Sequence, residues 1–305
     1  MNYILLDLEW NDAYFKKLHG FVNEIVEFGA VKLDENFNEV DRFVKIVRSS
    51  ITNRLSSRFK ELTGMTNEQM QSGIPFDEAL KQYKQWAGQD TITLTWSNSD
   101  LHTLYHNCVN FISDASAAQI GKYVDLQKYF QYELGLMGNP QKNQISLSNA
   151  ATLFGVNFSD ESLHHALDDS YLSAAILRKC YNKEHFELFI TDTSSNNFYE
   201  KMMYKAHYIN NMNHPLIKKE DLHIFCPKCK KRAERISSWR LKKPWFHTTF
   251  LCKECNLKFK GAVAFKRFYD KVEVKKRVFE PSVKVAVEKS TKFSGKEKNS
   301  FIKTK

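Results

Sequence analysis

The first 47 residues contain three apolar segments that fit consecutive β-strands, and this run limits the fold more than any other feature. Tyr3–Leu8, Glu24–Leu33 and Glu39–Val47 are rich in apolar and β-branched residues, and a polar turn separates the last two. Three such segments in succession predict a meander. The opening apolar stretch is too short for a signal peptide, and Asp7 interrupts it.

Helical and strand-like segments alternate after this meander. Several short helical patterns lie between Ser56 and Trp86, and Thr91–Trp96 follows as a β-branched strand. A further short strand is expected at Tyr123–Leu126, and helices are expected at 100–111, 127–134, 147–153 and 163–181. This order predicts an α/β fold of the ribonuclease-H-like kind, with a mixed five-stranded sheet flanked by helices.

Charge divides the chain into two parts. Residues 226–305 carry 24 Lys and Arg against 7 Asp and Glu, a net charge of +17, whereas residues 1–225 carry 21 against 28, a net charge of −7. Such asymmetry indicates an acidic working domain and a basic region for a polyanion. Nucleic acid is the favoured polyanion, an anionic membrane surface is the competing one, and a merely solvated basic face is the third interpretation.

No apolar run approaches the ~20 residues that a membrane-spanning helix needs. The composition, 42% hydrophobic and 26% charged, is typical of a globular protein. We therefore expect a cytoplasmic location and no membrane partner.

Acidic side chains follow the first expected strand. Asp7 and Glu9 are two residues apart, so in a strand both carboxylates point to the same side. Adjacent carboxylates repel each other unless a cation lies between them, and oxygen ligands suit Mg²⁺ or Mn²⁺. An Asp-x-Glu pattern alone is weak, because an exposed acidic strand end gives the same pattern.

Two further segments supply candidate functional groups. Asp100 follows the fourth expected strand, where a helix N-cap is the competing interpretation. The segment His164-His165-Ala166-Leu167-Asp168-Asp169 combines histidine with carboxylates at the start of an expected helix. A histidine together with carboxylates from several strand ends indicates a catalytic site more strongly than any one of them does.

These three segments resemble the motifs of the DEDDh exonucleases, a family of the DnaQ-like, ribonuclease-H-fold superfamily. Asp7 and Glu9 match the first motif, Asp100 matches the second, and the H-x₄-D pair His164 and Asp169 matches the third. The similarity covers about residues 1–182. Within the family, the spacing Trp96-x₃-Asp100-x₃-Leu104-x₃-Cys108 is most similar to the branch of KapD and the exoribonucleases of histone mRNA.

The resemblance implies a metal-dependent 3′→5′ exonuclease that releases 5′-nucleoside monophosphates. By this similarity, Asp7, Glu9, Asp100 and Asp169 hold two Mg²⁺ or Mn²⁺ ions, and His164 is the general base. The family spacing favours His164 over His165 as the base, and Asp169 over Asp168 as the ligand.

The branch resemblance also suggests the substrate. It favours single-stranded RNA over DNA. A DNA exonuclease in proofreading or repair, and a nucleic-acid-binding regulatory protein with an incidental nuclease fold, are the alternatives.

Four cysteines form two close pairs in the basic part. Cys226 and Cys229, and Cys252 and Cys255, give the pattern C-x₂-C…C-x₂-C with 22 residues between the pairs. In a reducing compartment this pattern predicts a structural zinc site with four thiolate ligands, and the segment resembles a zinc ribbon. The accompanying cations and the aromatic residues Trp239, Trp245 and Phe246 favour a grip on single-stranded nucleic acid over a folding clip or a protein-docking module.

These observations give a domain plan. We expect an exonuclease domain over 1–182, a helical connector over 183–224 and a zinc-binding basic β module over 225–289. Alternating valines around Glu280-Pro281 predict a hairpin within that module. Residues 290–305 are polar and lysine-rich, which predicts a disordered tail.

Overall fold

The computed structural model describes residues 1–141, 143–159, 164–195 and 197–279. The chain divides into two units, Met1–Met203 and Tyr204–Lys305. This division falls inside the stretch 183–224 for which the sequence suggests a connector. Among the described residues, no helix is long and apolar enough to cross a membrane.

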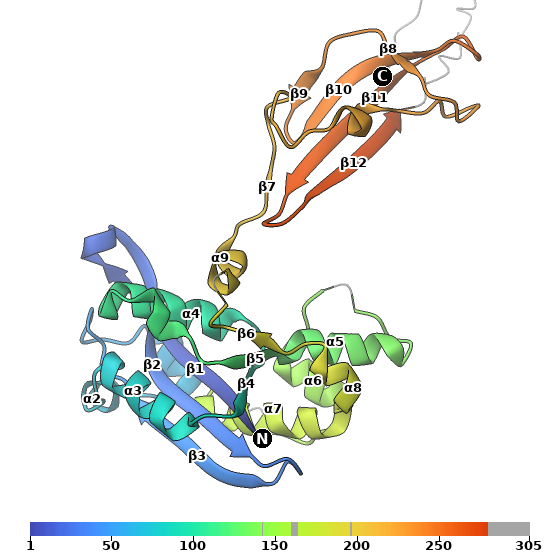
Figure 1. Cartoon of the computed structure of the whole chain (residues 1–305). Helices are drawn as coiled ribbons and strands as arrows, with labels where there is room; N and C mark the ends of the chain where they lie inside the picture. The colour runs from blue at the N-terminus through green and yellow to red at the C-terminus, as the bar shows by residue number, and fades with distance from the viewer. Residues whose placement is uncertain (142, 160–163, 196, 280–305) are drawn as a thin grey trace, which may run out of the picture. The chain divides into compact units, whose positions relative to one another are not determined.

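The first unit is built on a mixed sheet with the strand order β3-β2-β1-β4-β5-β6 (Figure 1). Its strands are β1 (Asn2–Phe15), β2 (Gly20–Leu33), β3 (Glu39–Ile46), β4 (Thr91–Thr95), β5 (Lys122–Asp125) and β6 (Thr191–Asp192). The strands β1, β2 and β3 pair antiparallel, and β4 pairs parallel with both β1 and β5. The sheet therefore has one strand more than the five expected, because the two-residue β6 adds an antiparallel edge strand beside β5.

Helices cover both faces of this sheet. They are α1 (Ser57–Thr63), α2 (Asn67–Gln71), α3 (Phe76–Ala87), α4 (Ser99–Asn107), α5 (Leu126–Leu136), α6 (Leu147–Leu153), α7 (Ala166–Cys180), α8 (Lys183–Glu187) and α9 (Phe198–Met203). Successive residues of β1 point to opposite faces. Leu5 therefore packs in a core with residues of α5, α6 and α7, whereas Leu6 packs in a core with residues of α3 and α4. Two cores thus fix the central strand from both sides.

The strand β1 is longer than the sequence predicts. It continues past Glu9 to Phe15 and pairs with β2 as far as Gly20, with a register shift between Glu9 and Trp10. The parallel pairing of β1 with β4 nevertheless ends at Leu5. Asp7 and Glu9 are therefore inside β1 rather than at its end, but they still lie beyond the carboxyl end of the parallel ladder, where open sheets place their sites.

The second unit is an antiparallel sheet with the order β12-β11-β10-β8, to which β7 and β9 add at the sides. Its strands are β7 (His207–Tyr208), β8 (Glu234–Arg235), β9 (Arg240–Lys242), β10 (Trp245–Cys252), β11 (Leu257–Arg267) and β12 (Val272–Phe279). The partner of β12 is β11, in full register from Lys260 to Arg267. The second arm of the hairpin expected around residues 280–281, and the tail at 290–305, lie outside the described residues.

Candidate active site and zinc centre

Three carboxylates meet beside the centre of the first sheet. One oxygen each of Asp7, Glu9 and Asp169 lies within 4.8 Å of the others. The two residues of β1 are on one side of the strand, and Asp169 is in the first turn of α7. Two of the three sequence motifs thus form one oxygen cluster of the kind that suits a divalent cation.

Asp100 reaches the same place from α4. Its Oδ1 accepts a hydrogen bond from the backbone N–H of Leu8, at 3.1 Å. That N–H is free for a side chain because the parallel pairing with β4 has ended three residues earlier, at Leu5. Asp100 is buried, 4% exposed, and lies inside the first turn of α4, where Asn98 is the N-cap residue. The simple N-cap interpretation of Asp100 is therefore wrong.

Burial and mutual repulsion make these carboxylates hard to ionise. Burial, together with the charges of Asp100 and Glu9, holds the pKa of Asp7 well above its usual range. Burial and the charge of Asp169 raise the pKa of Glu9 to about 8. Burial also raises the pKa of Asp100, to about 7. Ionising several of these carboxylates together is therefore unfavourable unless a positive charge lies between them.

The start of α7 positions the third motif. His164 has a positive φ of 74° and directly precedes the N-cap residue His165. Burial raises the pKa of Asp169, while the charge and the backbone N–H of His164 oppose that increase. The Oδ1 atom of Asp169 is buried and has no hydrogen-bond partner among the residues that the structure describes. His164 and Asp169 are therefore neighbours, and one carboxylate oxygen is left with unused coordinating capacity.

The first turn of α7 packs directly on β2. A Cβ atom at Gly29 would come within 2.2 Å of the backbone of Ala166 and Leu167. The hydroxyl of Ser170 donates to the carbonyl oxygen of Gly29, at 3.0 Å. This close approach fixes the distance between Asp169 on α7 and the acidic residues of β1, which pair with β2.

A fourth acidic residue, Glu27, lies beside the cluster and was not singled out from the sequence. It is directly opposite Glu9 in the β1–β2 ladder and is 6% exposed, and its Oε2 has no hydrogen-bond partner within the described part of the chain. Burial raises its pKa, while the charge of His165 and the backbone N–H of Ala166 counteract this. The available signal was a glutamate within the otherwise apolar stretch Ile25–Val31 of β2, because a buried carboxylate is rare unless it is paired.

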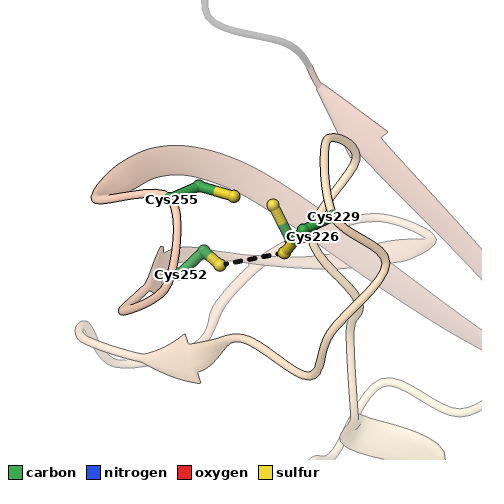
Figure 2. A group of neighbouring side chains, drawn as sticks. All are labelled: Cys226, Cys229, Cys252 and Cys255. Carbon is green, nitrogen blue, oxygen red and sulfur yellow. Dashed lines mark hydrogen bonds between the residues drawn. The ribbon is translucent and has the colours of Figure 1, made fainter.

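The four paired cysteines converge in the second unit. One sulfur atom of each of Cys226, Cys229, Cys252 and Cys255 lies within 4.8 Å of the others, and Figure 2 shows the side chains pointing to a common centre. The residue that follows each pair, Lys230 or Asn256, has a positive φ, so both turns have the same form. Four sulfur atoms in two matching turns are consistent with a tetrahedral zinc ion.

Backbone N–H groups favour the thiolate form of one of these cysteines, Cys226. Burial acts to raise the pKa of Cys226, but the backbone N–H groups of Cys229 and Lys228 outweigh it and lower the pKa to about 7. A thiolate is the form that binds zinc. The tight turn at the first pair therefore favours metal binding as well as bringing the sulfur atoms together.

A known family matches the region that forms the first unit. A family profile described as Exonuclease, of the RNase T type, matches residues 10–177, which is more than half of the chain. The chain belongs to this exonuclease family. The matched range begins directly after Glu9, so Asp7 and Glu9 precede it while Asp100 and Asp169 lie inside it.

Several proteins are similar to this member of the exonuclease family. ERI1 exoribonuclease 2 from Homo sapiens is 28% identical over 206 residues, covering 58% of the chain and 28% of the relative. The probable 3′-5′ exonuclease KapD from Bacillus subtilis is 30% identical over 91 residues, covering 29% of the chain and 43% of the relative. A PolC-type DNA polymerase III from Clostridium perfringens is 24% identical over 221 residues, covering 72% of the chain and 13% of the relative. The chain thus spans less than half of the length of each of these relatives.

The fold agrees with that of a solved nuclease domain. The nuclease domain of 3′hExo, described as a DEDDh family member bound to rAMP, superposes with a TM-score of 0.52 at 24% identity, covering 63% of this chain and 96% of that domain. This likeness confirms the predicted ribonuclease-H-like mixed sheet. The exonuclease family that the sequence motifs indicate is confirmed by the profile match.

Proposed function

We propose that this exonuclease hydrolyses single-stranded nucleic acid from its 3′ end and releases 5′-nucleoside monophosphates. The observation that carries the proposal is the convergence of Asp7, Glu9 and Asp169 within 4.8 Å in a chain of this family. Asp100 adds a fourth carboxylate, held by the N–H of Leu8 between the two acidic residues of β1. Such a group of carboxylates would be a liability to stability if it did not have a ligand.

The four carboxylates fit a pair of divalent cations. They are buried or half-buried, have raised pKa values, and leave Oδ1 of Asp169 without a partner. Asp7, Glu9, Asp100 and Asp169 would hold Mg²⁺ or Mn²⁺. When bound, these ions stabilise negative charge on the attacking and leaving oxygens of the phosphodiester.

His164 is the proposed general base. Imidazole titrates near neutrality, which suits proton removal from an attacking water. His164 is exposed and directly precedes the helix that carries Asp169, so it can reach a phosphate held at the carboxylates. The charge of His165 instead acts mainly on Glu27, the neighbour of Glu9 in the β1–β2 ladder. The Cys226, Cys229, Cys252 and Cys255 cluster would hold a structural zinc ion, because all four positions are protein ligands.

RNA is the favoured substrate, and DNA is the second candidate. The similarity to ERI1 exoribonuclease 2 and the branch-like spacing of the second motif support RNA. The similarity to a PolC-type DNA polymerase III supports DNA. Either substrate uses the same carboxylates, so the choice depends on contacts with the sugar.

Digestion of labelled oligomers tests the proposal. Oligomers of RNA and DNA with one sequence, labelled at the 5′ or the 3′ end, are incubated with Mg²⁺ or Mn²⁺. We expect a 5′-labelled RNA to shorten stepwise and a 3′-labelled RNA to release its label at once as a mononucleotide. Label release in the opposite order, or turnover without divalent cations, would contradict the proposal.

A further inference from the structure

The sheet of the second unit has two chemically different faces. Along β10, Phe246 and Phe250 point into the core, where they meet Val263 and Phe259 of β11. The residues between them point to the other side. We call that side the outer face and define it by the alternate residues of β9 to β12 that do not enter this core.

Seven cations lie on the outer face. The register of β9, β10, β11 and β12 places on it the side chains of Arg240, Lys242, Lys258, Lys260, Lys266, Lys275 and Arg277. Lys266 is half-buried, and the other six are exposed within their unit. The four strands contain one acidic residue, Glu273, whose carboxylate is 3.9 Å from Lys275. The outer face is thus strongly positive.

Two small residues of β11 leave room for large side chains of the neighbouring strands to contact each other. Ala262 and Ala264 of β11 lie on the outer face and are almost fully buried. They are covered because long side chains from the two flanking strands meet over them. The guanidinium of Arg277 lies 4.1 Å from the ring centroid of Trp245, and His247 stacks on Phe279 with centroids 5.8 Å apart.

These contacts hold rings and charges in a fixed layer. A cation 4.1 Å from an indole centroid is attracted to the ring face and loses side-chain freedom before any ligand arrives. Phe279 remains 40% exposed. Burial lowers the pKa of His247, and the nearby charges of Lys242 and Lys260 lower it further, as a positive local potential requires. Preorganised groups of this kind bind with a smaller entropic penalty.

We propose that the outer face, formed by β9 to β12, is the surface on which the module binds single-stranded nucleic acid. The inference rests on the proposed function, in which the bound strand is the substrate. It changes the surface expected from the sequence, because Phe246 is 3% exposed and packs in the core, so it cannot stack on a base. Trp245 and Phe279 are the rings on the outer face.

The combination of groups favours a nucleic acid strand over other polyanions. Lysines and arginines in rows along neighbouring strands can follow a phosphate backbone, and accessible rings can stack on bases. An anionic lipid surface would use the same cations but would not need the rings of Trp245 and Phe279 to be held in place by Arg277 and His247.

The test compares two triple variants of the full chain. Lys242, Lys258 and Lys260 on the outer face are changed to Gln. Among the described residues these three lysines have no ion pair. The control changes Lys218, Lys219 and Arg232 to Gln, which removes the same charge from the opposite side of the sheet. There Lys219 and Arg232 line a groove of about 690 Å³ with Phe250, and Lys218 lies near Val274.

Binding of a fluorescent single-stranded oligomer is measured at several salt concentrations without added Mg²⁺ or Mn²⁺, so that no cleavage occurs. Each lost phosphate contact removes a salt slope of about 0.7, so we expect the slope to flatten by about 2 and the affinity at 0.1 M salt to fall about 100-fold. The control should retain the wild-type affinity within a few-fold.

Two results would overturn the inference. One is an equal loss in both variants, which would mean that net charge rather than the outer face binds the strand. The other is unchanged oligomer binding together with lost binding to phosphatidylserine vesicles, which would assign the face to a membrane. Neither result bears on mononucleotide release by the wild-type chain, which tests the proposed function separately.

Discussion

The two units differ in where they place side chains of like charge. The first unit places the carboxylates of Asp7, Glu9, Asp100 and Asp169 where burial and repulsion raise their pKa values. The second unit spreads its cations over an exposed face, where solvent screens them. Negative charges held close together with little hydration favour a specific small cation, whereas positive charges spread over a surface attract any long polyanion. The comparison thus separates the proposed hydrolytic site of the first unit from the proposed binding surface of the second.

The largest effect is expected when one carboxylate of the cluster is removed. We expect Asp7→Asn to reduce mononucleotide release to background, because a neutral amide cannot replace the carboxylate in the cluster. Asp168→Asn on the same helix as Asp169 is the matched control and should retain most of the activity. Initial rates on a labelled oligomer at saturating Mg²⁺ give the comparison, with circular dichroism to check folding. Substantial turnover by a folded Asp7→Asn variant would remove Asp7 from the site.

The second test addresses the other unit alone. We expect a Cys226→Ser, Cys252→Ser double variant to lose its single zinc ion and to unfold the second unit, because structural zinc contributes roughly 10–16 kcal/mol in small zinc-dependent peptides. Elemental analysis measures the zinc. Rates at saturating substrate should change little, since the carboxylates belong to the first unit. Unchanged zinc content would refute the ligand assignment.

A smaller effect is expected for the proposed base. His164→Ala should slow hydrolysis at least ~10²-fold, the usual contribution of a general base. His165→Ala is the adjacent control and should be much milder. Single-turnover rates distinguish a slower chemical step from weaker binding. The reverse ranking of the two variants would assign the role to His165.

The smallest expected effect is a pH dependence of stability. The pKa values of Glu9 and Asp100, about 8 and about 7, are higher in the folded chain than the ~4 of unfolded carboxylates. Between about pH 4 and 8 the folded state therefore binds more protons than the unfolded state. The free energy of unfolding should fall as pH rises through this range. In buffer free of Mg²⁺ and Mn²⁺, we expect Tm to decrease by several degrees from pH 5.5 to 8.5.

Added Mg²⁺ should reverse that trend. The increase in Tm should be larger at pH 8.5 than at pH 5.5, because only ionised carboxylates bind the cation. Asp7→Asn should show a weaker pH dependence in the absence of Mg²⁺. An equal effect of Mg²⁺ at both pH values would argue that it binds elsewhere.

Much of the first unit could be predicted from the sequence. Strands and helices there carry strong apolar periodicity, so five strands and the main helices were expected near their observed positions, and α6 coincides with its expected range, Leu147–Leu153. The edge strand β6 was missed because two residues, Thr191 and Asp192, carry no periodic pattern. The extension of β1 to Phe15 was missed because its polar residues do not look like a buried strand.

The sites were predictable to different degrees. The cysteine cluster of the second unit was predictable from the spacing alone, since the two cysteines of a C-x₂-C turn are close in sequence. The neighbourhood of Glu27 depends on the β1–β2 register, which places it opposite Glu9, and sequence periodicity does not specify that register. The outer face depends in the same way on the pairing of β12 with β11. The sequence suggested β12 only as the first arm of a hairpin that turns at Glu280-Pro281, and gave no partner for it in β11.

The contact between Gly29 and the start of α7 has a consequence for how this site can vary. Most distances in a protein are set by side chains and can change in small steps, one methyl group at a time. Here the spacing is set by the absence of a side chain, because the backbone of Ala166 and Leu167 occupies the place of a Cβ atom. No smaller residue exists, and the next larger one does not fit without moving α7. A substitution of Gly29 therefore cannot adjust in small steps the separation between the strand that carries Asp7 and the helix that carries Asp169. Evolution can keep the present separation at this position or lose it.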